Sequence, residues 1–319
     1  MNELAMVKIM TATSKNLFSK ASLEEKKPPI LIAEIGCNHS GEIEVAREMI
    51  SIAKTFCEVD YVKFQKRDPS ELAMTEQYRS PHPVPQNSYG ATYGEHREFL
   101  EFTIKEHESL KAFSDEVGVG YSCSVWDLTS AQEIIGLKPD FVKIPSAMNT
   151  HFVMLELICE QYEGDIHLSL GMTTRKEEET ICDLLRVQGR LKDTVLYHCT
   201  SGYPVPVSDV CLLELNHISE RYGDSIKAVG FSAHYTGIGL DAPAFLLGAQ
   251  YIERHFTLNR SWKGTDHAAS LEPDGLRRVR KDTINLAQAL REKDKEILEI
   301  EVDQREKLKF NSVTKTTTP

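Results

Sequence analysis

The chain has 319 residues, of which 41% are hydrophobic and 27% charged, a balance typical of soluble globular proteins. Its formal net charge of −11 argues against a nucleic-acid surface or a basic membrane-binding surface, because an excess of carboxylates favours neither. An anionic substrate is still compatible with this charge, since a cleft can be locally basic on an acidic protein.

Short apolar or β-branched runs alternate with longer amphipathic stretches along most of the chain. Eight runs are strand candidates, at residues 31–35, 61–64, 119–124, 141–144, 166–170, 195–199, 228–232 and 249–255. This alternation predicts a parallel sheet covered by helices. Eight repeats fit an α/β fold of the closed (β/α)8 TIM-barrel type. A doubly wound open sheet is the alternative, but the Gly-x-Gly-x-x-Gly turn typical of that fold is missing after the first strand.

We divide the chain into an N-terminal extension (1–29), a barrel domain (30–300) and a C-terminal tail (301–319). A polar insertion, residues 67–94, follows the second strand and should lie on the C-terminal face as a lid or a disordered loop. Residues 281–301 form a long helix-forming stretch. The last residues, 311–319, are polar and expected to fray.

The cysteines and the apolar runs predict the cellular compartment of the protein. No run approaches the roughly 20 apolar residues that cross a bilayer, and residues 1–29 lack the apolar core of a signal peptide. The seven cysteines are odd in number and form no Cys-x-x-Cys pair, which favours buried free thiols in a reducing environment. We expect a soluble cytoplasmic protein with no membrane or nucleic-acid partner.

Polar side chains lie within or just after the predicted strands, although burying an unpaired charge is costly. A single strand lysine or histidine is more often a structural ion pair or a satisfied ring. Here, however, seven strands contribute, and in a barrel they converge on the C-terminal mouth, which predicts a site there. The residues are Glu34, Lys63, Gln65, Lys143, Ser146, Ser169, His198, Thr200, Ser232, His234, Glu253 and His255.

Two lysines from different strands, Lys63 and Lys143, point toward this mouth together with several serines. Cations and hydroxyls of this kind suit a phosphate and a carboxylate. A Schiff-base lysine, as in aldolases, is the main alternative. Two lysines accompanied by serines favour ionic binding.

Two histidines, His234 and His255, end the seventh and eighth strands. Neighbouring strands lie about 5 Å apart, so the two imidazoles can share one divalent ion and leave positions open for water and substrate. Either ring could instead cap its strand. His267 is a possible third ligand, for which we favour a structural role.

Short motifs follow one another in a specific order along residues 29–290. They are IAEIGCNH (32–39), VKFQ (62–65), YGEH (93–96), KIPS (143–146), SLGM (169–172), HCTSGYP (198–204), GFSAH (230–234), ERHFT (253–257), KGTDH (263–267) and SLEP (270–273). Through them the chain resembles the sialic acid synthase family, enzymes that condense phosphoenolpyruvate with an N-acylated hexosamine. The regions around Tyr93 and residues 262–264 resemble the animal-type branch, which uses a 6-phosphorylated sugar.

The resemblance implies a reaction that yields a nine-carbon sialic-acid-like 2-keto acid and phosphate. The sugar would be N-acetylmannosamine, its 6-phosphate or a related hexosamine. His234 and His255 would hold manganese, with magnesium or cobalt as alternatives. The catalytic and sugar-contacting residues would be Glu34, Tyr203 and Asp266. The substrate-binding residues would be Lys63, Gln65, Lys143, Ser146, Ser169, Ser201 and Ser232.

Three features depart from the family pattern. Met148 stands where the family usually has an acidic residue, and Ser201 replaces an Asn found in some bacterial members. We expect the antifreeze-like domain that normally follows the barrel to be absent, and a homodimer partner or a separate chain to supply it, or a substrate that does not need it. These departures motivate an alternative function, a non-catalytic or partner-dependent barrel that binds sugar phosphates.

Overall fold

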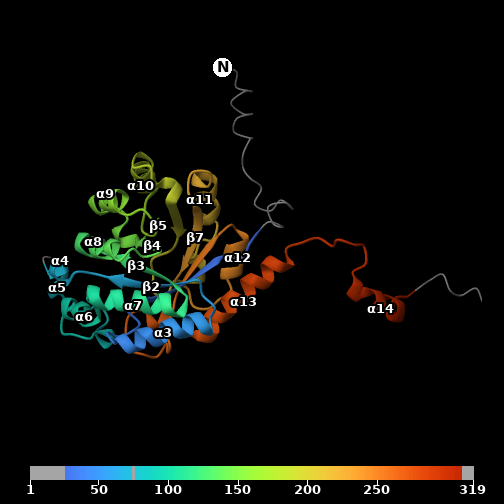
Figure 1. Ribbon diagram of the computed structural model, residues 1–319, viewed down its shortest axis with the longest axis horizontal. Helices are drawn as coiled ribbons and strands as arrows, with labels where there is room; N and C mark the ends of the chain where they lie inside the picture. The colour runs from blue at the N-terminus through green and yellow to red at the C-terminus, as the bar shows by residue number, and fades with distance from the viewer. Residues whose placement is uncertain (1–25, 74–75, 311–319) are drawn as a thin grey trace, which may run out of the picture.

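The computed structural model describes residues 26–73 and 76–310. The expected frayed end at 311–319 and most of the N-terminal extension, residues 1–25, lie outside the described residues. Figure 1 shows a ring of helices around a central sheet, with one helix, α14 (Glu299–Leu308), standing apart from the barrel.

Eight parallel strands close into a barrel in sequence order, each paired with the next and β8 with β1. They are β1 (Ile30–Gly36), β2 (Tyr61–Lys66), β3 (Gly120–Val125), β4 (Phe141–Ile144), β5 (Asp165–Ser169), β6 (Thr194–His198), β7 (Ala228–Ala233) and β8 (Tyr251–His255). The structure confirms the (β/α)8 barrel, and every predicted strand overlaps an observed one.

Helices cover the outside of the barrel, and the longer ones among them, such as α3 (Ile43–Thr55), bury one apolar face. In α3, the buried residues Ala46, Met49, Ile50 and Ala53 recur at the spacing of one helix face. The other helices are α4 (Pro69–Ala73), α5 (Glu76–Arg79), α6 (Tyr93–Leu100), α7 (Ile104–Val117), α8 (Leu128–Gly136), α9 (Phe152–Gln161), α10 (Arg175–Val187), α11 (Glu214–Tyr222), α12 (Asp241–Leu246) and α13 (Pro273–Ala289), with α3 spanning Ile43–Thr55.

A small cluster of aromatic and aliphatic side chains fills the N-terminal end of the barrel interior. Phe141, Tyr197 and Tyr251 belong to it, and the His167 ring stacks on Phe141 with 3.7 Å between centroids. The Lys143 Nζ lies 3.4 Å from the centroid of the Tyr197 ring. This cluster therefore forms the floor of the barrel interior, directly below the polar residues of the mouth.

Two predicted segments differ from the structure. The prediction of one continuous helix over 281–301 is wrong, because α13 ends at Ala289 and a separate helix, α14, begins at Glu299. The buried residues of α13 end at Thr283 and residues 291–296 are exposed, so no packing supports a continuous helix there. The insertion 67–94 contains short helices, among them α4 and α5, rather than one irregular loop.

The cysteines are all free thiols. Five are buried, as expected, whereas Cys37 is half-buried and Cys211 is exposed on the connection after β6. Within residues 26–73 and 76–310, no helix combines the length and the apolarity that crossing a membrane requires.

Candidate functional site

A cleft of about 220 Å³ opens at the C-terminal ends of the strands. Every residue with a predicted catalytic, substrate-binding or metal-binding role lines it, except Asp266. Those residues are Glu34, Lys63, Gln65, Lys143, Ser146, Ser169, Ser201, Tyr203, Ser232, His234 and His255. The structure therefore brings together, from seven strands and their following turns, side chains that are distant in sequence.

Strand register explains how these side chains meet. Glu34 of β1 pairs in register with Lys63 of β2 on one side and with His255 of β8 on the other. Ser232 of β7 is level with Glu253 of β8. Because side chains alternate between the two faces of a strand, inward positions two residues apart form stacked layers inside the barrel.

Two lysines and two glutamates form a buried charge network at the base of the cleft. Lys63 Nζ contacts a carboxylate oxygen of Glu34, donates to Ser124 Oγ at 2.7 Å and lies 3.8 Å from Glu253. Lys143 Nζ donates to Glu253 Oε2 at 3.2 Å. All four charged side chains are at most 7% exposed, so each charge depends on the others for compensation.

The two lysines differ in their electrostatic surroundings. Burial alone would lower the pKa of Lys63, but the adjacent Glu253 and Glu34 carboxylates outweigh it and raise that pKa. Burial lowers the pKa of Lys143; Glu253 is the main group that opposes this effect, and the charge of Lys63 adds to the lowering. Lys63 is therefore a fixed cation, and Lys143 is the more easily neutralised amine.

A group of hydroxyls faces the lysines around Gly171. The backbone N–H of Gly171 donates to Ser146 Oγ at 3.1 Å, and a Cβ at Gly171 would lie only 2.5 Å from Ser201 Oγ and 2.6 Å from Ser146 Oγ. A glycine is thus required for the two hydroxyls to converge. With two cations nearby, this arrangement suits an anion that has several acceptor oxygens.

The two histidines lie side by side, with 5.4 Å between ring centroids. The Nδ1–H of His234 donates to the carbonyl oxygen of Thr200 at 2.9 Å, which directs the Nε2 lone pair away from the strand. Burial, together with the neighbouring His255, lowers the pKa of His234 to about 4, so the ring is neutral at pH 7. A neutral imidazole with a fixed tautomer is what a divalent metal ion requires.

Few potential metal ligands surround His255. Its Nδ1 is buried without a hydrogen-bond partner among the described residues and lies 3.9 Å from Asp266 Oδ2. No cluster of three or more potential ligands occurs in the part of the chain that the structure describes. The residues fit an open metal site in which two imidazoles are supplemented by water or substrate oxygens.

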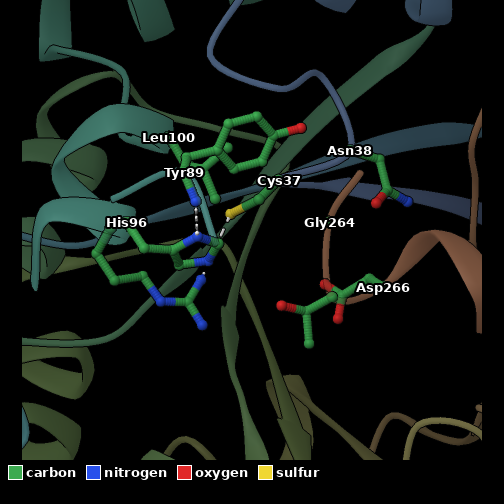
Figure 2. Close-up of a pocket in the computed structure, with 9 residues that line it drawn as sticks. Cys37, Asn38, Tyr89, His96, Leu100, Gly264 and Asp266 are labelled. Carbon is green, nitrogen blue, oxygen red and sulfur yellow. Dashed lines mark hydrogen bonds between the residues drawn. The ribbon is translucent and has the colours of Figure 1, made fainter. Parts of the chain in front are cut away.

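Tyr203 and Asp266 lie at the rim. The Tyr203 ring lies over both histidines, 4.5 Å from His234 and 5.7 Å from His255 between centroids, and burial raises the pKa of its hydroxyl. Asp266 lines a smaller pocket beside the cleft, together with residues of the insertion and of α6. Figure 2 shows Asp266 and Asn38 on one side of this pocket and His96 with Tyr89 on the other.

Some residues expected at the mouth lie elsewhere. His198 faces outward, where its Nε2–H donates to the carbonyl oxygen of Val210 at 2.7 Å, and Thr200 Oγ1 donates to the Asp209 carbonyl. Placing His198 at the mouth was wrong, because strand alternation turns Tyr197 and Cys199 inward instead. His267 is buried and hydrogen-bonds Thr257 at 2.7 Å, as a structural residue would.

The sequence departure at Met148 does not alter the cleft wall, because Met148 packs against the hydrophobic core instead. Conversely, four residues that line the cleft received no predicted role: Glu253, which was expected at the mouth, and Ser124, Trp126 and Cys199, which were not predicted there. The sequence pointed to Glu253, because a carboxylate within an apolar strand is unusual. Nothing in the sequence pointed to Ser124, because a serine at the end of a buried strand is common in protein cores.

Comparisons with known proteins agree with this geometry. The sequence profile of the NeuB family matches residues 49–295. The N-acetylneuraminate-9-phosphate synthase of Mus musculus is 33% identical over 299 residues, which cover 92% of this chain and 80% of that protein. The Drosophila melanogaster protein of the same name is 37% identical over 251 residues, covering 77% and 65%.

A bacterial relative and a solved structure are also similar. The N,N'-diacetyllegionaminic acid synthase of Campylobacter jejuni is 31% identical over 252 residues, covering 79% of this chain and 74% of that protein. The crystal structure of an N-acetylneuraminic acid synthetase from Leptospira borgpetersenii superposes with a TM-score of 0.72 at 24% identity, covering 89% and 94%. At this identity the superposition supports the fold alone.

Proposed function

Because this chain belongs to the NeuB family, the family of the sialic acid synthases, we propose that it condenses phosphoenolpyruvate with an N-acyl hexosamine. The products would be a nine-carbon 2-keto acid and phosphate. The observation that carries the proposal is the juxtaposition, in one cleft, of the buried lysine pair Lys63 and Lys143 with the histidine pair His234 and His255.

Phosphoenolpyruvate would occupy the floor of the cleft. Its phosphate and carboxylate would meet the two lysines and the hydroxyls of Ser146, Ser201 and Ser232. The hydroxyls supply directional donors, whereas the lysines neutralise charge. Ser169 and Gln65 complete the wall, with Gln65 held by its Nε2–H bond to Glu34 at 2.8 Å.

The sugar aldehyde would lie toward the histidines, under Tyr203. A manganese ion held by His234 and His255 would polarise the aldehyde oxygen as a Lewis acid, with magnesium or cobalt as alternatives. The fit of the site to a metal rests on the neutral ring of His234 and on the unpartnered buried Nδ1 of His255. Asp266 would accept hydrogen bonds from sugar hydroxyls beyond the aldehyde.

The bond changes balance with water as the only further reactant, which supplies the proton of the new hydroxyl and the proton that leaves with phosphate. C3 of phosphoenolpyruvate forms a bond to the aldehyde carbon, and the aldehyde oxygen becomes a hydroxyl. The cation left at C2 gains water, and the resulting tetrahedral centre releases phosphate by breaking its C–O bond and becomes the ketone. Glu34 would stabilise that cation; its carboxylate lines the cleft beside Lys63, which supports this role.

A turnover assay tests the proposal. The purified protein with manganese, phosphoenolpyruvate and either N-acetylmannosamine or its 6-phosphate should consume phosphoenolpyruvate and form the keto acid, detected by mass spectrometry. Lys143→Met should abolish consumption. Phosphoenolpyruvate that binds without turnover, with any of these sugars or related hexosamines, would refute the proposal in favour of a non-catalytic sugar-phosphate-binding barrel. Trapping of pyruvate on Lys143 by borohydride would instead reveal Schiff-base chemistry.

A further inference from the structure

Tyr197 of β6 places the face of its ring against the ammonium group of Lys143. The Lys143 Nζ lies 3.4 Å from the ring centroid, and the two residues, Lys143 and Tyr197, are 2% and 0% exposed. A cation within about 6 Å of an aromatic centroid is attracted by the electron-rich ring face, most strongly where both groups are out of water. The ring therefore stabilises the Lys143 charge without adding a negative charge to the cleft.

The Tyr197 ring is held in this position by its neighbours. Gly230 of β7 is level with Tyr197, and a Cβ at Gly230 would lie only 2.5 Å from the ring. Tyr197 Oη and His167 Nδ1 share a hydrogen bond of 2.8 Å, and the His167 ring stacks on Phe141. Burial raises the pKa of the Tyr197 hydroxyl and lowers the pKa of His167, each well out of its usual range, so both side chains are neutral at pH 7.

The carboxylate of Glu253 does not balance the charge of Lys143 alone. Its Oε2 lies 3.2 Å from Lys143 Nζ but also 3.8 Å from Lys63 Nζ, so one oxygen serves two cations. The other titratable groups that act on Lys143 are Lys63 itself and the thiol of Cys199, which follows β6. Because burial still lowers the pKa of Lys143, its charge depends on a stabilising contact that needs no carboxylate.

The two lysines of the cleft also differ in their free donors. A lysine ammonium has three N–H groups. Lys63 Nζ faces oxygens of three side chains, those of Glu34, Ser124 and Glu253. Among the described residues, Lys143 Nζ has one such acceptor, Glu253, and its other contact is the aromatic ring. Lys143 therefore keeps an N–H group for a ligand, whereas Lys63 faces an oxygen with each of its three.

We propose that Tyr197 is a positioning residue of the anion site, whose ring face keeps the Lys143 ammonium charged and leaves one of its N–H groups for phosphoenolpyruvate. Tyr197 does not line the cleft, so it acts through Lys143. A second carboxylate in its place would also stabilise the ammonium, but it would repel the phosphate and the carboxylate of the substrate. A neutral ring face supports the cation and leaves its attraction for an anion intact.

This inference rests on the proposed function for the identity of the anion, but the pKa of Lys143 tests it without any substrate. NMR of protein isotopically labelled at lysine gives this pKa, with the Lys143 Cε signal identified by its loss in Lys143→Arg. Tyr197→Leu should lower the pKa of Lys143 by about 1 to 1.5 pH units, the range of a desolvated cation–π contact. Tyr197→Phe keeps the ring face and should keep the wild-type value.

Two further variants separate this role from simple packing. Tyr251→Leu removes a ring from the same floor cluster, over which no lysine lies in the part of the chain that the structure describes, and should leave the pKa of Lys143 unchanged. A trifluorinated phenylalanine at position 197 keeps the shape of the Tyr197→Phe ring but withdraws electrons from its face. It should lower the pKa of Lys143 even if Tyr197→Leu does not fold.

Equal values of the Lys143 pKa with the plain and the fluorinated ring would overturn the role of Tyr197, as would an unchanged pKa in a folded Tyr197→Leu protein. In an active enzyme, KM for phosphoenolpyruvate should begin to rise at a pH about 1 to 1.5 lower in Tyr197→Leu than in the wild type. A lowered Lys143 pKa in a protein that never consumes phosphoenolpyruvate would refute the proposed function alone. Turnover with an unchanged pKa would refute the role of Tyr197 alone.

Discussion

Glu253 holds the two buried lysines of the cleft together, and replacing it by glutamine tests that role. Its Oε2 lies 3.2 Å from Lys143 Nζ and 3.8 Å from Lys63 Nζ, and its Oε1 accepts from Ser232 at 2.9 Å. Glu253→Gln keeps the size of the side chain and an acceptor for Ser232. It removes the negative charge, and its amide NH2 group then faces Lys143 in place of a carboxylate oxygen.

The structure sets the size of the effect. At an effective dielectric constant of about 20, the two separations correspond to attractions of roughly 5 and roughly 4 kcal/mol. The cost of burying the carboxylate offsets part of this, so we expect the free energy of unfolding to fall by about 3–5 kcal/mol, as for other broken buried pairs. Ser232→Ala removes a neutral donor from the same carboxylate and should cost about 1–2 kcal/mol.

Urea unfolding followed by the fluorescence of Trp126 and Trp262 measures these changes. The double variant Glu253→Gln with Lys143→Met removes one charge of each sign, so its loss should be smaller than the sum of the two single losses. A loss below about 1 kcal/mol for Glu253→Gln, or strictly additive losses in the double variant, would refute an electrostatically coupled network.

Three further predictions concern the metal site, the hydroxyl group and a buried histidine. His234→Ala should lose manganese, by metal analysis, together with phosphoenolpyruvate consumption; full activity without metal would contradict this. Gly171→Ala should raise KM for phosphoenolpyruvate about 10-fold, because its methyl displaces Ser146 and Ser201; an unchanged KM would contradict the contact. Burial lowers the pKa of His107 to about 3, below the unfolded value of about 6.5, so its penalty appears as pH falls below 6.5. Between pH 7 and 4.5 this histidine should cost the wild type about 2–3 kcal/mol of unfolding free energy, and His107→Gln should lack that loss. Leu110→Ala keeps the imidazole ring, so its unfolding free energy should fall with pH as steeply as that of the wild type.

The strands could be predicted because burial on both faces leaves near-continuous apolar runs, and polar residues stand out against them. Lys63, Lys143 and His255 were found in this way. The error at His198 arose because a fully buried strand shows no alternation from which to read its inward face. Only the observed register places Tyr197 and Cys199 inside the barrel.

Residues from loops were harder to place. Asp266 was assigned from the family resemblance, and its position 3.9 Å from His255 depends on how the segment after β8 folds back. His96, on the wall of the smaller pocket, belongs to a helix outside the barrel repeat, so no strand periodicity pointed to it. Its proximity to the cleft results from the insertion after β2, whose three-dimensional path has no simple sequence signature.

The charge balance of the cleft explains why an acidic protein can bind anions without a strongly basic surface. Lys63 and Lys143 are matched by Glu34 and Glu253, so the charged side chains that line the cleft sum to zero when the histidines are neutral. A substrate that brings a phosphate and a carboxylate therefore meets lysines already engaged with glutamates. Its affinity must come from hydroxyl donors and from positive charge added at the histidine pair, which couples metal binding to substrate binding.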